Sequence, residues 1–382
     1  MTTEIDVPVQ EAVDDARGER AALEPMSVLP FLQVLVNVVG SDLHCKVGSA
    51  PRVRLDGRLR RLDTAALTSQ DTEYMATEVM TAEQYQRFLE TQEADFAYTL
   101  PGFGRFRVNV FRARGAAALV FRRVAEGAIT LAQLGIPTVI ESLSLEPRGL
   151  VLVTGPTGSG KTTTLAGMVH HINTHREAHI VTIEDPIEVL HHDERSMVNQ
   201  REVNIDTEDF NTALRAAMRQ DPDVVLVGEM RDVETVRAAI SASETGHFVM
   251  STLHTTDATE TISRIIDFFP LSEQKQIRLS LAGALKGIIC QRLVPRADGH
   301  GRCVAMEICI NTGRIADAII DPNKTHSIQD LVADGDFYGM RTFDQHLVEL
   351  IRDGIVALDD AMTASSSPHD LTVALRQRGI IV

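Results

Sequence analysis

A glycine-rich stretch offers the clearest chemistry in this sequence. Gly155 to Thr162 reads Gly-Pro-Thr-Gly-Ser-Gly-Lys-Thr, a full match to the pattern G-x-x-x-x-G-K-[ST]. Glycines let successive backbone N–H groups point inward around phosphate oxygens, and the following helix starts with its positive end at the same point. Lys161 would reach the β- and γ-phosphates, and the Thr162 hydroxyl would bind Mg²⁺. The predicted phosphate-binding residues are Gly155, Pro156, Thr157, Gly158, Ser159, Gly160, Lys161, Thr162 and Thr163.

The sequence also bears on which nucleotide would bind. A guanine-specific site is expected to carry Asn-Lys-x-Asp, whereas the Asn323-Lys324 pair is followed by Thr325-His326. ATP with Mg²⁺ is therefore the favoured ligand. The alternative is a glycine turn that binds nothing.

Two acidic clusters follow apolar runs that look like strands. Glu184 to Glu188 follows Ile180–Ile183, and Gly228-Glu229 follows Val224–Val227. Ligands in open parallel sheets bind beyond the carboxyl ends of strands, and hydrolysis needs one carboxylate for water and another for the metal. We expect both Glu188 and Glu229 to be functional, and Glu229 to act on Mg²⁺ through a water molecule, since Gly228 stands where an aspartate is usual. The alternative is helix capping, which we prefer for Asp232.

Two histidines, His247 and His254, bracket a further apolar run, Phe248–Leu253. A lone histidine is usually a structural residue, but two histidines at a core strand beside a phosphate site are equally consistent with a role at the nucleotide.

The first third of the chain contains a concentration of arginines. Arg105, Arg107 and Asn109 alternate with apolar residues, which places them on one face of a strand, and no acid occurs from Pro101 to Ala125. An arginine that reaches the γ-phosphate from a partner accelerates phosphoryl transfer, which suggests a ring of subunits. The alternative is a basic strand paired with acids on a neighbouring surface.

Apolar runs alternate with helical patterns from Gly149 onward, which predicts an α/β fold with a parallel sheet. Before it, Met26 to about Val124 reads as a small α+β domain. Helical patterns there cover Val28–Val39 and Ala82–Leu89, strand patterns flank a turn in Pro51–Leu62, and Phe103–Arg123 reads as two strands joined by Ala113–Ala118.

The predicted organisation has five parts. Residues 1–25 form a disordered acidic leader, 26–125 the first domain, 126–148 a linker, 149–362 the ATPase domain with an α-helical C-terminal section, and 363–382 a hinge and last helix. Within the C-terminal section we expect helices over Ser272–Leu293 and Met340–Asp353, and a serine-rich hinge over Thr363–Asp370.

Composition limits the class of protein. The 382 residues carry a formal charge of −16, which disfavours a nucleic-acid-binding surface. No run approaches the ~20 apolar residues of a membrane span, and the acidic leader is the opposite of a secretory signal, so we expect a cytoplasmic protein. The four cysteines contain no C-x-x-C pair, which argues against zinc.

Six motifs in this order resemble one family, the secretion and pilus-motor ATPases, and within it the type IV pilus retraction branch. They are Gly155–Thr162, Thr182–Glu188, Asn199–Val203, Gly228–Asp232, Glu244–His247 and Thr252–Thr256. The resemblance covers about Met26 to Gly354 and includes Gly40–His44 and Gly104–Asn109 in the first domain.

The resemblance implies a PAS-like first domain, a RecA-like P-loop ATPase domain and a homohexameric ring that powers pilus retraction and twitching motility. It also implies a cytoplasmic position against the inner membrane, with the pilus platform protein and a related pilus motor ATPase as partners. By motif position, Glu188 is the general base, Glu229 the metal-side glutamate, and His247 and His254 sense the nucleotide. Residues expected to reach across the subunit interface are Arg107, Arg114 and Arg122.

Three other functions remain open. A sibling motor for pilus extension or type II secretion is one, although extension motors carry a four-cysteine zinc site that this chain lacks. An accessory ring protein with little turnover is another, and Gly339–Gln345 is similar to accessory members of the family. A DNA translocase is the least favoured, because of the net charge.

Overall fold

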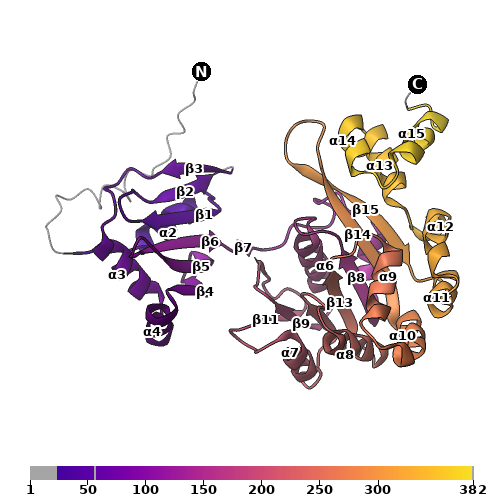
Figure 1. Ribbon diagram of the computed structural model, residues 1–382, viewed down its shortest axis with the longest axis horizontal. Coiled ribbons are helices and arrows are strands. Elements are labelled where there is room, and N and C mark those ends of the chain that lie inside the picture. The colour runs from indigo at the N-terminus through magenta and orange to yellow at the C-terminus, as the bar shows by residue number, and fades with distance from the viewer. Residues whose placement is uncertain (1–23, 56, 381–382) are drawn as a thin grey trace. The chain divides into compact units, whose positions relative to one another are not determined.

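Two compact units make up the chain in a computed structural model that describes residues 24–55 and 57–380. Unit 1 ends at Glu126 and unit 2 begins at Gly127. Figure 1 shows unit 1 in indigo and unit 2 from magenta to yellow. Almost all of the expected acidic leader lies outside the described residues.

Unit 1 is a six-stranded antiparallel sheet with helices packed on one face. The strand order is β3-β2-β1-β6-β5-β4, and contacts of α2 with β1 and of α3 with β6 cover that face. Its elements are α2 (Leu29–Asn37), β1 (Asp42–Lys46), β2 (Arg52–Leu55), β3 (Arg58–Arg61), α3 (Ser69–Val79), α4 (Ala82–Thr91), β4 (Glu93–Leu100), β5 (Gly104–Ala113), β6 (Ala116–Arg123) and the short β7 (Ala125–Glu126).

The period-two pattern predicted for β5 is confirmed. Phe106, Val108 and Val110 are fully buried in the unit 1 core, while Arg107 between them is exposed. The predicted connection over Ala113–Ala118 was too wide, because the strands continue to a tight turn at Arg114-Gly115, where both residues have positive φ. Pairing across the sheet holds alanines that have little strand preference of their own.

Unit 2 is built on a seven-stranded sheet, and the predicted parallel α/β fold is confirmed. The order is β11-β9-β12-β13-β8-β14-β15; every pair is parallel except β14 with β15. Its strands are β8 (Gly149–Thr154), β9 (His179–Glu184), β11 (Met197–Glu202), β12 (Val224–Val227), β13 (Phe248–Leu253), β14 (Leu285–Pro295) and β15 (Arg302–Ile310); a short β10 (Val189–Leu190) lies outside this sheet.

Helices cover both faces of this sheet, which explains why its central strands are apolar throughout. Val151 and Val153 pack on one side with residues of α5 and α6. Leu150 and Leu152 face the other side, where α7 to α11 contribute to the core. The helices are α5 (Val139–Ser144), α6 (Lys161–His175), α7 (Phe210–Ala217), α8 (Val233–Glu244), α9 (Ala258–Asp267), α10 (Leu271–Ala284) and α11 (Gly313–Ile320).

One predicted helix was wrong in its second half. The helix expected over Ser272–Leu293 is α10, which ends at Ala284, and the chain continues directly as β14. Gly287 weakens a helix there, while Ile288 and Ile289 are β-branched residues that favour strands. Pairing with β8 and β15 decides between the two, and it places β14 beside the glycine-rich loop.

The C-terminal section is helical after β15. It consists of η1 (Thr325–Ser327), α12 (Ile328–Ala333), η2 (Asp336–Tyr338), α13 (Phe343–Arg352), α14 (Leu358–Ala364) and α15 (Pro368–Gln377). The serine segment between α14 and α15 is fixed by Asp344, whose carboxylate accepts hydrogen bonds from the Ser365 hydroxyl and the backbone N–H groups of Ser366 and Ser367.

The segment before β8 packs onto unit 2. Leu131, Ile136 and Ile140 are buried in the same core as α6. None of the helices in the described part of the chain is long and apolar enough to cross a bilayer.

Candidate functional site

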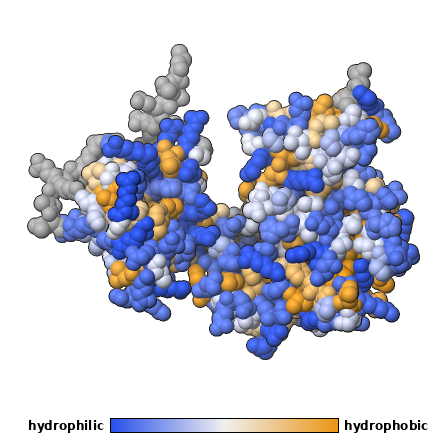
Figure 2. Space-filling model, in the orientation of Figure 1, coloured by the Kyte–Doolittle hydropathy of each residue, from blue (hydrophilic) through white to orange (hydrophobic). Residues whose placement is uncertain are grey.

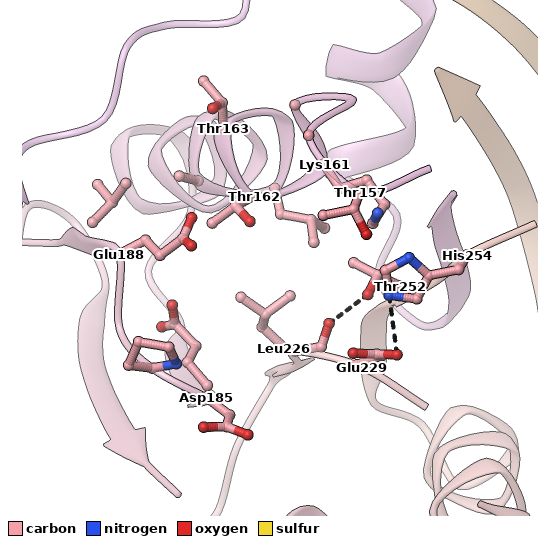
Figure 3. A pocket seen from close by; sticks show the side chains of 18 of the residues that line it. Thr157, Lys161, Thr162, Thr163, Asp185, Glu188, Leu226, Glu229, Thr252 and His254 are labelled. Carbon is pink, nitrogen blue, oxygen red and sulfur yellow. Dashed lines mark hydrogen bonds and ion pairs between the residues drawn. The ribbon is translucent and has the colours of Figure 1, made fainter. Parts of the chain in front are cut away.

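A pocket of about 650 Å³ lies beyond the carboxyl ends of β8, β9, β12 and β13. Figure 3 shows side chains from the glycine-rich loop, α6 and the strand ends facing the same space. Among the residues that line it are Thr157, Gly158, Gly160, Lys161, Thr162, Thr163, Glu184, Asp185, Glu188, Gly228, Glu229, Arg231, Thr252, His254, Leu293 and Arg302.

The loop after β8 has a backbone that requires glycine. Gly155 has a φ of +139°, and a Cβ there would lie 2.4 Å from the backbone oxygen of Gln291. Gly158 and Gly160 have φ values of +78° and +90°. Side chains at these positions would be strained, so the glycines are needed for the loop to turn back over the start of α6.

Lys161 is the first residue of α6, and its side chain returns to the loop. The Nζ donates to the carbonyl oxygens of Gly155 at 2.8 Å and Pro156 at 3.1 Å. Burial lowers the pKa of Lys161, and the nearby Glu229 carboxylate opposes that shift. The ammonium group is thus held beside the loop at the rim of the pocket.

Thr162 and Glu188 approach the pocket from opposite elements. Thr162 is exposed in the first turn of α6, and Glu188 follows β9. In Figure 3 the Glu188 carboxylate and the Thr162 hydroxyl both point into the space between them.

The donor set fits Mg²⁺ that is shared with a phosphate ligand. A hydroxyl and carboxylates are oxygen donors of the kind that Mg²⁺ prefers, and Mg²⁺ usually keeps several waters and few protein ligands. In the described ranges no group of three or more histidine, cysteine, aspartate or glutamate side chains could hold a metal by itself.

Glu229 is held by two partners at the end of β12. Its Oε1 lies 3.1 Å from His254 Nε2, and its Oε2 accepts a 2.8 Å hydrogen bond from Arg231 Nε. The Glu229 side chain is 19% exposed, against 48% for His254 and 60% for Arg231. The hydrogen bond to Glu229 raises the pKa of Arg231, so this arginine stays charged.

Gly228 precedes Glu229 where little space exists for a side chain. A Cβ there would lie 3.1 Å from the Ile183 carbonyl oxygen and 3.2 Å from the Phe210 ring. The neighbouring Thr252 hydroxyl donates to the Gly228 carbonyl at 2.6 Å. A side chain at position 228 would therefore require the Ile183 carbonyl and the Phe210 ring to shift by a few tenths of an ångström.

Glu184 is the buried member of the first acidic cluster. Its Oε1 accepts from the Thr182 hydroxyl at 2.6 Å and from Gln200 Nε2 at 3.0 Å. Burial raises the pKa of Glu184, although these two hydrogen bonds counteract the shift. Glu188, by contrast, is exposed.

The structure does not bring every predicted residue into the pocket. His247 lies at the amino end of β13, a strand's length of about 20 Å from the His254 end, and its Nδ1 lies 3.0 Å from the Ala242 carbonyl oxygen. Asp232 caps α8, since its carboxylate accepts from the Thr235 N–H at 2.7 Å, and the capping interpretation is confirmed.

Other pocket residues received no role from the sequence. Arg231 and Thr252 belong to the motifs Gly228–Asp232 and Thr252–Thr256, so their positions in the sequence could have identified them as pocket residues. Leu293 and Arg302 lie on β14 and β15. Leu293 fell within the predicted helix, which hid its proximity to the loop.

Three predicted residues, Arg107, Arg114 and Arg122, lie in unit 1. Register places Asp42 opposite both Arg54 and Arg122, and Arg122 opposite Arg107, so the four form one row across β2, β1, β6 and β5. Arg114 lies in the turn after β5 and is exposed.

Asp42 fixes part of this row. Its Oδ1 accepts from Arg122 Nε at 2.9 Å, and its Oδ2 lies 3.5 Å from Arg54 Nε. Burial alone would raise the pKa of Asp42, but hydrogen bonds from Arg122 and Ser41 outweigh it and hold the pKa below its ordinary value. The ion pair between Asp42 and Arg122 partly supports the alternative in which the arginines pair with acids. However, 68% of the Arg122 side chain is still exposed to solvent.

Comparison with known proteins places this geometry in a family. The type IV pilus retraction ATPase PilT of Pseudomonas aeruginosa is 41% identical over 90% of this chain and all of its own length. The type IV pilus ATPase PilU of the same organism is 38% identical over 91% of this chain and 90% of its own. A crystal structure of the pilus retraction motor PilT with bound ADP superposes with a TM-score of 0.84 at 43% identity, over 90% of this chain and 98% of that one.

The family model for type II/IV secretion system proteins matches residues 36–352, which include most of both units and every predicted site residue. This chain belongs to the type II/IV secretion system protein family.

Proposed function

We propose that this protein is an ATP-hydrolysing motor that works as a hexameric ring and powers type IV pilus retraction. The observation that carries the proposal is the convergence of the glycine-rich loop, Glu188 and the Glu229–His254 pair on one pocket. Two relatives with this overall length are named as a pilus retraction ATPase and a retraction motor with bound ADP.

In this proposal the loop binds the phosphates of ATP. The N–H groups of Gly158 and Gly160 and the start of α6 supply positive partial charges, and Lys161 supplies a full one. Glu188 orients and deprotonates the attacking water, since it is exposed to the pocket and faces Thr162.

Mg²⁺ would be held by the Thr162 hydroxyl and, through water, by Glu229, and would neutralise developing charge on the phosphates. Arg231 and His254 keep Glu229 oriented toward the pocket. Because His254 contacts both Glu229 and the pocket, it is the residue through which the nucleotide's presence would be sensed in the same subunit.

Arginines of a neighbouring subunit would complete the site. Arg107 is exposed and lies beside Arg122, whose Nε is fixed by Asp42. Because the hydrogen bond to Asp42 uses Nε, the terminal N–H groups of Arg122 are left to bind a phosphate or a carboxylate. We therefore place Arg107 and Arg122, with Arg114 in the adjacent turn, at the interface between subunits of the ring.

The proposed location is the cytoplasmic face of the inner membrane at the base of the pilus. The partners would be the inner-membrane platform protein, a related pilus motor ATPase and other copies of this chain, without nucleic acid. This part of the proposal rests on the similarity to the two Pseudomonas relatives.

An accessory role is the second candidate function, because PilU is nearly as similar as PilT. A pilus extension or type II secretion motor is less well supported. The four cysteines are free, Cys45 lies in unit 1, and no metal-binding cluster occurs within the described ranges.

A genetic experiment separates these functions. Cells that lack the protein should keep surface pili but lose twitching, and the wild-type gene should restore twitching while Glu188→Gln should not. Loss of all pili would instead favour an extension motor. Restoration by Glu188→Gln would favour the accessory role.

A further inference from the structure

We propose that Gln291 is a positioning residue that holds the peptide between Ser159 and Gly160 in the orientation needed for phosphate binding. The inference deepens the function proposed above and rests on it. Gln291 lies on β14, the strand that neighbours β8 on the side away from Glu229.

The contact between Gln291 and the loop is buried and direct. Gln291 is only 1% exposed, and its Nε2 donates to the Ser159 carbonyl oxygen at 2.9 Å. A Cβ on Gly160 would lie 3.2 Å from the same Nε2. The backbone oxygen of Gln291 lies against Gly155, so strand and loop are in contact at both ends of the loop.

One peptide plane links this contact to the pocket. The carbonyl of Ser159 and the N–H of Gly160 belong to the same trans peptide, so they point in opposite directions. While Gln291 holds the Ser159 carbonyl toward β14, the Gly160 N–H must point away from β14, toward the interior of the loop. N–H groups of such loops surround the α- and β-phosphates of the nucleotide.

Glycine makes the external hold necessary. Rotation of this peptide changes ψ of Ser159 and φ of Gly160, and glycine accepts positive and negative φ about equally well. The φ of +90° at Gly160 is therefore not fixed by the residue itself. The hydrogen bond from Gln291 favours one of the two orientations, because the flipped peptide would leave the Gln291 amide without its buried acceptor.

The test is nucleotide binding by the full-length Gln291→Met variant, which keeps the length of the side chain and removes the donor. ADP and adenosine are the probes, measured by calorimetry or by competition against a fluorescent ADP. We expect the Kd for ADP to rise on the order of tenfold, since a buried acceptor loses its partner. The Kd for adenosine, which has no phosphate, should stay within twofold.

Asn311 provides a matched control. It follows β15 and lies beside Leu285, the first residue of β14. Its Nδ2 also donates to backbone carbonyl oxygens, those of Ala282 and Leu285, both at 2.8 Å. Asn311→Ala should lower the unfolding temperature while the Kd for ADP stays within twofold. If Gln291→Met does not fold, Gln291→Leu is tested in the same way, because its apolar side chain also lacks a donor.

Two results would overturn the inference while wild type binds ADP. One is an unchanged Kd for ADP in the folded Gln291 variant, and the other is an equal loss of ADP and adenosine affinity, which indicates general disorder of the site. A wild-type protein that does not bind ADP would instead reject the proposed function itself.

Discussion

His254 Nε2 lies 3.1 Å from Glu229 Oε1, across the ends of the adjacent strands β13 and β12. This pair joins the two strands at the edge of the pocket, and Arg231 holds the other carboxylate oxygen of Glu229. Figure 2 shows hydrophilic residues interspersed with hydrophobic ones on the visible face of unit 2.

Loss of the His254 contact should slow ATP hydrolysis without preventing binding. In His254→Ala, Glu229 keeps only Arg231, and we expect kcat to fall on the order of tenfold with little change in the Kd for ATP. His254→Gln retains a donor of similar reach and should stay within a few-fold of wild type. Steady-state ATPase assays measure kcat. A kcat of His254→Ala equal to that of wild type would show that the contact does not contribute to hydrolysis.

Arginines of unit 1 should act on a neighbouring subunit's nucleotide. Lys161→Ala lacks a functional loop and Arg107→Ala lacks the exposed arginine, so rings of either alone should be inactive. Co-expressed with different tags and purified as mixed rings, the two should regain part of the ATPase activity, because some interfaces combine an intact loop with an intact arginine.

The matched control for that experiment is Arg58→Ala, an exposed arginine on the edge strand β3. It should retain wild-type activity alone. Mixed Lys161→Ala and Arg107→Ala rings that remain inactive would place Arg107 outside any shared site.

Gly228 should tolerate an added side chain only at a cost in stability. Because a Cβ at this position would press on the Ile183 carbonyl and the Phe210 ring, Gly228→Ala should reduce the free energy of unfolding by about 1–3 kcal/mol. Gly283→Ala is the matched control: it lies in α10 with nothing within 4 Å of the added Cβ, and should gain about 0.5–1 kcal/mol. Chemical denaturation measures both, and an unchanged Gly228→Ala variant would contradict the close packing.

Glu184 should make stability depend on pH. Burial raises its pKa in the folded protein, so folding retains a proton that the unfolded chain releases, and this carboxyl's contribution to stability falls as pH rises from about its ordinary pKa to beyond the raised value. The Glu184→Gln variant keeps a side-chain oxygen that can accept from Thr182 and Gln200, and it does not titrate. The free energy of unfolding is measured from about pH 4 to about pH 8. The value for Glu184→Gln relative to wild type should increase as pH rises, by ~1.4 kcal/mol per unit of pKa shift. A constant difference would rule out this titration.

The sequence was most informative where one local pattern decides the structure. The loop from Gly155 to Thr162, the apolar strands β9, β12 and β13 and the Asp232 cap depend on short-range geometry and were found where predicted. Helices on both faces leave those strands with no polar face, so the apolar runs alone identified them.

Long-range pairing produced the features that sequence analysis missed. Leu285–Leu293 has apolar spacing compatible with a helix, and only contact with β8 and β15 makes it a strand. That error concealed Gln291. His247 and His254 are seven positions apart in the sequence, but the extended strand β13 separates them, so their closeness in the sequence did not imply a shared site.

The central claim is that this pocket binds and hydrolyses ATP, and turnover by purified wild type, Lys161→Ala and Glu188→Gln tests it most directly. The account predicts that wild type hydrolyses ATP in the presence of Mg²⁺, that Glu188→Gln binds ATP but hydrolyses it at least ~100-fold more slowly, and that Lys161→Ala neither binds nor hydrolyses it. Equal rates in all three proteins would contradict it.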